Sequence, residues 1–224
     1  MVRGHRLWVI DPSVNRPEDE GVAEILGDWD GASRLFQPAL RAGDDPGPET
    51  GYDTDGVVLM GSASSVHDSP HWLRPLREWL QPILDGSVRV PLLGICYGHQ
   101  LIAQLAGGDV GWMHDDRARR YGVETSRLEG GRLLPGSHEL RVMVSHREEV
   151  QRVPRRYRTC ASRSGVVVDG LEHESLPIFS FQFHPEGRDQ FAAHAEIPRE
   201  AVDEAVLRDG RRLLGAFREY VKAG

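Results

Sequence analysis

The chain alternates between short apolar runs and longer segments in which apolar residues recur at helical spacing. Continuous apolar runs are typical of buried parallel strands, and they occur at 6–10, 56–61, 90–96 and 176–184. Helical spacing occurs at 18–42, 71–84, 98–107 and 198–223. Strands that alternate with helices in this way predict an α/β fold with a mainly parallel central sheet flanked by helices.

Two of the predicted helices contain residues that disfavour helical structure. Pro75 and Pro82 lie in the second helical segment, and the N–H that each proline lacks predicts a break or a kink there. Gly210 and Gly215 are weak points of the C-terminal segment. Residues 41–55 are rich in turn-forming residues and predict a loop.

The middle of the chain, 109–170, has a different pattern. Short runs of alternating apolar and polar residues, such as 139–145 and 165–170, predict antiparallel strands and hairpins. We therefore expect a small antiparallel addition to the parallel sheet. The 224 residues are enough to bury a full core and fit a single domain over 1–224.

Composition and charge limit the kinds of partner that we expect for this protein. A net charge of −7 argues against a nucleic-acid-binding protein, which usually presents a basic surface. No apolar run approaches the ~18 residues of a membrane span, and the N-terminus lacks the pattern of a signal peptide. The two cysteines, Cys96 and Cys160, are too few for a disulfide framework. We therefore expect a cytoplasmic protein with no nucleic-acid and no membrane partner.

Cys96 lies where a predicted strand meets a predicted helix, in the sequence Gly94-Ile95-Cys96-Tyr97-Gly98. This G-x-C-x-G arrangement is the cysteine form of the nucleophile elbow, a tight turn that projects the nucleophile above the sheet edge. The N-terminus of the following helix favours the thiolate and leaves free backbone N–H groups beside the sulfur. A buried structural cysteine in a strand-to-helix turn is the alternative interpretation.

A base for this thiol is predicted at the end of the last apolar strand, in the sequence FQFHPEG at 181–187. Parallel strands end at the same edge of a sheet, where the sites of α/β proteins form. We therefore expect His184 to lie beside Cys96, with the Glu186 carboxylate holding the far nitrogen of the imidazole. Cysteine, histidine and carboxylate form one of the recurring catalytic triads.

A turn of small residues follows the strand at 56–61, and its backbone N–H groups from about Ser62 could join that of Tyr97 in an oxyanion hole. The alternatives are a phosphate cradle or a plain loop, but the sequence matches neither a P-loop nor a dinucleotide fingerprint. The HDSPH sequence at 67–71 is only a weak metal signature. We expect no metal site and no cofactor.

Two motifs together, GICYGHQ at 94–100 and FQFHPE at 181–186, resemble those of the class I glutamine amidotransferases, in particular the amidotransferase domain of GMP synthases. The resemblance extends over about 5–195 and leaves a helical extension at 196–224. It implies a flavodoxin-like architecture. It also implies VSHREEV at 144–150 as the segment that holds glutamine.

The resemblance implies a role for each matching residue. Cys96 would be the nucleophile, His184 the base and Glu186 its orienting group. The oxyanion hole would form at Gly61, Ser62 and Tyr97, and the α-amino and α-carboxylate end of the substrate would be held by Gln100, Ser145 and His146. One departure is Ser62, because the family often has glycine there, and a positive φ at this position would strain a serine.

The implied activity is hydrolysis of the side-chain amide of glutamine through a γ-glutamyl thioester on Cys96, with ammonia passed to a separate acceptor enzyme. No S-G-G-x-D-S pyrophosphatase signature is present, so a synthase would be another polypeptide. Two alternatives stay open. One is a stand-alone hydrolase that removes a γ-glutamyl group from a conjugate, with another γ-glutamyl amide as substrate. The other is a non-catalytic interaction protein with the same fold.

Overall fold

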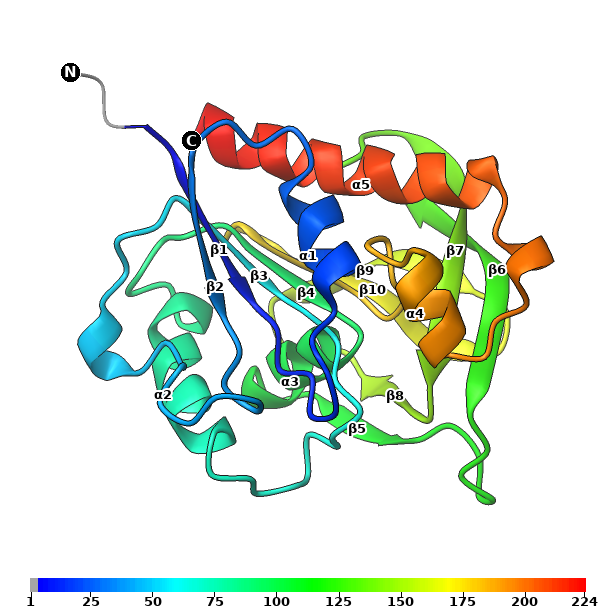
Figure 1. Cartoon of the computed structure of the whole chain (residues 1–224), viewed down its shortest axis with the longest axis horizontal. Helices are drawn as coiled ribbons and strands as arrows, with labels where there is room; N and C mark the ends of the chain where they lie inside the picture. Colours follow the sequence, from blue (N-terminus) through cyan, green and yellow to red (C-terminus); the bar gives the residue numbers. More distant parts are fainter. Residues whose placement is uncertain (1–3) are drawn as a thin grey trace.

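Within residues 4–224, which the computed structural model describes, nine strands form one mixed sheet in the order β2-β1-β3-β4-β11-β10-β9-β6-β7 (Figure 1). The first five strands pair in parallel: β2 (Ala32–Phe36), β1 (Arg6–Ile10), β3 (Gly56–Leu59), β4 (Leu92–Ile95) and β11 (Ile178–Phe181). The sheet continues with antiparallel strands: β10 (Val166–His173), β9 (Tyr157–Arg163), β6 (Arg120–Glu129) and β7 (Ser137–His146). A separate antiparallel pair joins β5 (Asp109–Trp112) and β8 (Glu148–Arg152). The predicted α/β fold class is confirmed.

Helices cover both faces of the parallel half of the sheet (Figure 1). On one face, α2 (Leu73–Leu84) and α3 (Tyr97–Leu105) share a core with β1, β3 and β4 that includes the fully buried Trp79. On the other face, α1 (Asp19–Leu26) and α5 (Glu204–Ala223) share a second core with the same strands and with β11. A short helix, α4 (Asp189–His194), contacts α1, and single 3-10 turns lie at Pro48–Thr50 and Arg199–Ala201. Over the described residues, no helix combines the length and the apolar character that a membrane span needs.

The prediction of a helix over 18–42 was wrong in its second half. The helix α1 ends at Leu26 because Gly27 takes a φ of +48° and its N–H bonds back to the Ala23 carbonyl. The chain then forms β2, which pairs with β1 at the sheet edge. Most of β2 is exposed, so its apolar residues do not form the continuous run that marks the buried strands.

The prolines and glycines do not interrupt their helices as predicted. Pro75 lies in the first turn of α2, where the missing N–H has no intrahelical partner to lose. Pro82 lies in the last turn, and α2 ends two residues later. Gly210 and Gly215 both lie inside the continuous helix α5.

The C-terminal helix α5 is part of the core and supports the end of the strand that carries the predicted base. Its apolar residues pack on the sheet, with Leu213 and Phe217 almost fully buried. The Asp209 carboxylate accepts a hydrogen bond from the Arg141 N–H of β7. Gly210 lies so close to the chain after β11 that a Cβ there would be 2.2 Å from the Pro185 carbonyl oxygen. The segment at 196–224 therefore helps to position the site.

Candidate active site

Cys96 forms the tight turn that the sequence predicts between β4 and α3. Its φ of 50° and ψ of −100° lie in a region that non-glycine residues avoid, which costs about 1–3 kcal/mol. The two small neighbours are required sterically. A Cβ at Gly98 would lie 2.3 Å from the Leu59 carbonyl oxygen, and a Cβ at Gly94 would lie 2.8 Å from the Gly98 carbonyl carbon.

His184 and Glu186 form a buried pair at the same sheet edge. The His184 Nδ1 atom lies 2.7 Å from Glu186 Oε1, and both side chains are less than a tenth exposed. Burial disfavours the charged ring, but the Glu186 carboxylate and the Cys96 sulfur outweigh it and raise the pKa of His184 to about 10. The Nε2 atom of His184 is buried and has no hydrogen-bond partner among the described residues, so it is available for proton transfer.

The ends of four parallel strands build one cavity of about 610 Å³. The segments after β4 and β11 contribute Cys96, His184 and Glu186, whereas the segments after β3 and β1 contribute Gly61 and Ser13 among others. This is the carboxyl edge of the parallel strands, where ligand sites of α/β proteins lie.

The residues predicted for the oxyanion hole lie beside the triad. Gly61 and Ser62 line the cavity, and a Cβ at Gly61 would lie 2.8 Å from His184 Cε1, so only glycine fits there. Ser62 does not take a positive φ, and its hydroxyl donates to the Pro12 carbonyl. The N–H of Tyr97 is the first of α3 and has no intrahelical partner, while the Tyr97 side chain is buried in the core.

Of the three residues predicted to hold the substrate, only Ser145 lines the cavity. Gln100 is buried, and its amide nitrogen donates to the Glu148 carbonyl and to Gln182 Oε1. His146 is buried beside Arg163, and burial together with that charge lowers the pKa of His146 to about 3. Gln100 and His146 therefore lie behind the cavity wall, and their roles stay predictions.

The sequence profile of the glutamine amidotransferase class-I family matches residues 34–202. The chain belongs to this family. It is 39% identical over 127 residues to one subunit of the glutamine-hydrolysing GMP synthase of Pyrococcus abyssi, covering 56% of this chain and 61% of that protein. It is 34% identical over 159 residues to the GMP synthase of Saccharomyces cerevisiae, covering 69% of this chain and 28% of that protein. The chain thus spans less than two thirds of the length of these relatives.

Solved structures of amidotransferases share the fold along the whole chain. A glutamine amidotransferase from Thermotoga maritima superposes with a TM-score of 0.74 at 18% sequence identity, covering 99% of both chains. A glutamine amidotransferase from Methylobacillus flagellatus superposes with a TM-score of 0.73 at 16% identity, covering 99% of this chain and 95% of that chain.

Two features of this amidotransferase site were missed by sequence reasoning. The first is Gln182, whose amide contacts Cys96; it lies two residues before His184, so the alternation of strand side chains could have placed it on the same side. The second is the segment at 13–18, which lines the same cavity as Cys96, His184 and Glu186. It is held by α4, since Glu18 pairs with His194 at 2.8 Å and Gln190 donates to the Pro17 carbonyl. No local pattern marks that contact.

Proposed function

We propose that this chain hydrolyses the side-chain amide of glutamine and releases ammonia for a separate acceptor enzyme. The observation that carries the proposal is the strained Cys96 elbow in one cavity with the buried pair His184 and Glu186. Membership of the class-I family supports the same chemistry. The intact triad also counts against a non-catalytic interaction protein.

The reaction would run through a thioester. The Cys96 thiolate attacks the side-chain carbonyl carbon of glutamine, and the N–H groups of Ser62 and Tyr97 bind the negative oxygen. The carbon–nitrogen bond then breaks, and the His184 imidazolium gives its proton to the departing nitrogen, which leaves as ammonia. Water attacks the thioester and gives a proton to His184. The carbon–sulfur bond breaks, which releases glutamate and restores the thiolate.

The charge of His184 supports its role as the acid. Because the pKa of His184 is raised to about 10, the ring carries a proton at neutral pH and can donate it. Glu186 fixes the ring through Nδ1, which leaves Nε2 to face the reaction. We assign substrate positioning to Ser145 at the cavity surface, whereas Gln100 and His146, which lie behind the cavity wall, would act only through the residues that they contact.

A larger γ-glutamyl amide is a second candidate substrate. The cavity volume of about 610 Å³ lies in the range that accommodates drug-sized ligands, so a γ-glutamyl conjugate would fit. The two candidates differ in the leaving amine and in the need for a partner. For the glutamine reaction we propose a separate synthase subunit, since several relatives are themselves named as single subunits of GMP synthases. We propose the cytoplasm as the location, because both cysteines are free.

The test is substitution of the nucleophile combined with site-specific labelling. The variant Cys96→Ala should stay folded and lose at least about 1000-fold in glutamine or γ-glutamyl amide hydrolysis. A glutamine-like electrophile should modify Cys96, as read by peptide mass spectrometry. Cys160 is the internal control, because it is buried and burial raises the pKa of its thiol to about 12. Inactivation with label on Cys160 alone would refute the assignment.

A further inference from the structure

Gln182 presents its side-chain amide to the nucleophile from within the protein. Its Nε2 atom donates to Cys96 Sγ at 3.6 Å, and the side chain is completely buried. The Gln182 backbone N–H is fixed by the Asp169 carbonyl at 2.9 Å. The Gln182 amide therefore donates a hydrogen bond to the Cys96 sulfur from the protein interior.

Gln100 fixes which end of this amide faces the sulfur. The Nε2 group of Gln100 donates to Gln182 Oε1 at 3.2 Å and to the Glu148 carbonyl at 2.7 Å. An amide nitrogen has two N–H donors, and these two contacts use both. Since Gln182 Oε1 accepts from Gln100, the Nε2 end of Gln182 must point at Cys96.

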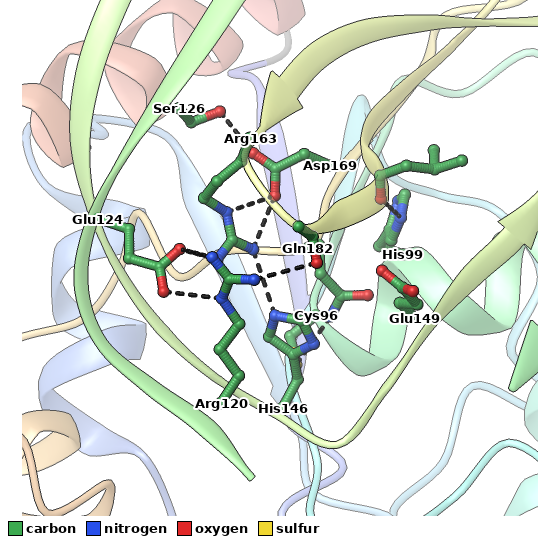
Figure 2. A network of polar contacts seen from close by, with 12 residues as sticks. Cys96, His99, Arg120, Glu124, Ser126, His146, Glu149, Arg163, Asp169 and Gln182 are labelled. Carbon is green, nitrogen blue, oxygen red and sulfur yellow. Dashed lines mark hydrogen bonds and ion pairs between the residues drawn. The ribbon is translucent and has the colours of Figure 1, made fainter. Parts of the chain in front are cut away.

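The Glu148 carbonyl, which accepts from Gln100, is also contacted by His146. His146 belongs to the network of polar contacts around Arg163 (Figure 2). The His146 Nδ1 atom lies 3.0 Å from the Glu148 carbonyl, and its Nε2 lies 3.2 Å from Arg163 Nη2. Because arginine can only donate, Nε2 is the acceptor and the ring proton is on Nδ1, directed at the Glu148 carbonyl. Arg163 is itself fixed by ion pairs with Asp169 and Glu124.

The second contact of the sulfur becomes unfavourable when the thiol ionises, so the thiolate relies on the positive His184 ring and on the Gln182 amide, which both face it. Cys96 Sγ donates to the Ser145 carbonyl at 3.8 Å. Loss of the proton removes this hydrogen bond and leaves a carbonyl oxygen facing a negative sulfur. The amide of Gln182 keeps its N–H at any pH, and a hydrogen bond to a charged acceptor is stronger than one between neutral groups.

We propose that Gln182 is a catalytic residue that stabilises the Cys96 thiolate through its Nε2 amide, with Gln100 and His146 as positioning residues that fix the orientation of that amide. The proposal deepens the proposed function, because it rests on Cys96 as the nucleophile. It predicts an effect on the reactivity of the sulfur whether or not glutamine is present.

The experiment measures the rate of Cys96 alkylation by iodoacetamide as a function of pH, followed by peptide mass spectrometry without glutamine. In Gln182→Met, which removes the amide at similar length, the midpoint of the pH profile should rise by about one unit or more. At pH values below both midpoints, this lowers the alkylation rate about tenfold. Gln182→Glu should raise the midpoint further, because it places a carboxylate beside the thiolate. The matched control is Gln104→Met on helix α3, whose amide contacts Arg77 and His67; its profile should match that of the wild type.

A profile of folded Gln182→Met or Gln182→Glu that superimposes on the wild type would overturn the proposal. Should both variants fail to fold, side-chain amide NMR of the wild type decides. One glutamine NH₂ signal should shift with the Cys96 titration and stay unshifted in Cys96→Ala; no such signal would overturn the proposal. Shifted profiles without hydrolysis of any γ-glutamyl amide would refute the proposed function while supporting the role of Gln182. Normal hydrolysis with unshifted profiles would support the proposed function and refute the role of Gln182.

Discussion

Buried histidines of this protein are held in opposite charge states by what surrounds them. His184 faces the Glu186 carboxylate and the Cys96 sulfur, which together raise its pKa to about 10 despite burial. His146 is buried beside the Arg163 guanidinium, which adds to burial and lowers its pKa to about 3. The charge on His184 disfavours a second positive ring at His146. The His184 ring is therefore charged and can donate a proton, whereas the His146 ring is neutral and connects Arg163 to the Glu148 carbonyl.

Removal of His184 should cost far more activity than removal of the charge at Glu186. We expect His184→Ala to lose about 1000-fold in kcat/KM and Glu186→Gln to lose about 10- to 100-fold, because an orienting group matters less than the acid it holds. In the wild type, kcat/KM should fall as pH rises through about 10, where His184 loses its proton. In Glu186→Gln this fall should occur at lower pH. Equal pH profiles for the two proteins would contradict the role of Glu186.

A third histidine, His99, should make the fold sensitive to acid. It is fully buried between the Ser180 hydroxyl and the Val168 carbonyl, and burial lowers its pKa from 6.5 to about 3. Between these values the unfolded chain binds a proton that the folded ring does not, so stability falls as pH drops. The loss approaches about 1.4 kcal/mol per pH unit.

Urea unfolding measures how the free energy of unfolding depends on pH, and it is carried out at pH 7, 6 and 5 for the wild type and for His99→Gln. Gln cannot titrate, so the free energy of unfolding of the variant should depend less steeply on pH, although the variant is less stable at pH 7. The difference between the two curves isolates His99 from other acid-sensitive groups. Parallel curves would show that His99 does not contribute.

At the scale of elements, helix α5 supports the chain after β11, which carries His184. Its N-cap is Asp203, whose carboxylate accepts from the Ala205 and Val206 N–H groups. Further along the helix, Gly210 contacts the Pro185 carbonyl, next to His184. Substitutions at Asp203 and at Gly210 should therefore differ in their effect on the position of His184.

We expect Asp203→Ala to lower stability by about 1 kcal/mol, as loss of an N-cap does, and to leave kcat/KM unchanged. Gly210→Ala should displace Pro185 and the neighbouring His184, because its Cβ would lie 2.2 Å from a carbonyl oxygen that cannot move freely. We expect at least a tenfold loss of kcat/KM, measured under conditions where both variants are folded. An equal kcat/KM for the two variants would show that α5 does not position the site.

The elements that the sequence predicted correctly are those whose pattern is local. The strands β1, β3, β4 and β11 are mostly apolar, and all of their residues except Arg6 are buried, so their runs stand out. The edge strand β2 is mostly exposed and was taken for helix. That Cys96, His184 and Glu186 lie in one cavity was predictable because strained turns and strand ends leave short motifs. The contacts of Gln182 with Cys96 and of α4 with residues 13–18 join distant segments, and a single sequence does not show which distant segments meet.

At the scale of the whole molecule, the cavity is shaped by segments from both halves of the chain. The segment at 13–18 and helix α4 both line it, and Phe191 of α4 packs against His184 with the ring centroids 4.1 Å apart. Gly61 and Cys96 line it from just after β3 and β4. The cavity holds Arg16 and Arg119 as well as the triad. A partner that docks at this edge would therefore contact the same segments that enclose the substrate.

We predict that the isolated chain hydrolyses free glutamine weakly. An ammonia donor that is inactive without its acceptor enzyme does not hydrolyse glutamine unproductively. Addition of a cognate synthase subunit should therefore raise kcat/KM for glutamine at least about tenfold, which is a coupling typical of linked sites. Steady-state glutamate release with and without the partner measures this, beside a panel of bulkier γ-glutamyl amides. Fast glutamine turnover that no partner changes and no conjugate surpasses would indicate a plain glutaminase.

The hydrogen bonds between the first turns of α1 and α4 have a consequence for how the protein is made. Glu20 and Gln190 exchange two hydrogen bonds across 170 residues of sequence, and the base at His184 is synthesised long after the thiol at Cys96. A ribosome-bound chain that has not yet emerged to residue 184 lacks the histidine that faces Cys96, and one that has not emerged to residue 190 lacks the contact between α1 and α4. Under the proposed function, an unfinished copy would therefore not hydrolyse glutamine, and activity would begin only when segments from the two halves of the sequence have met.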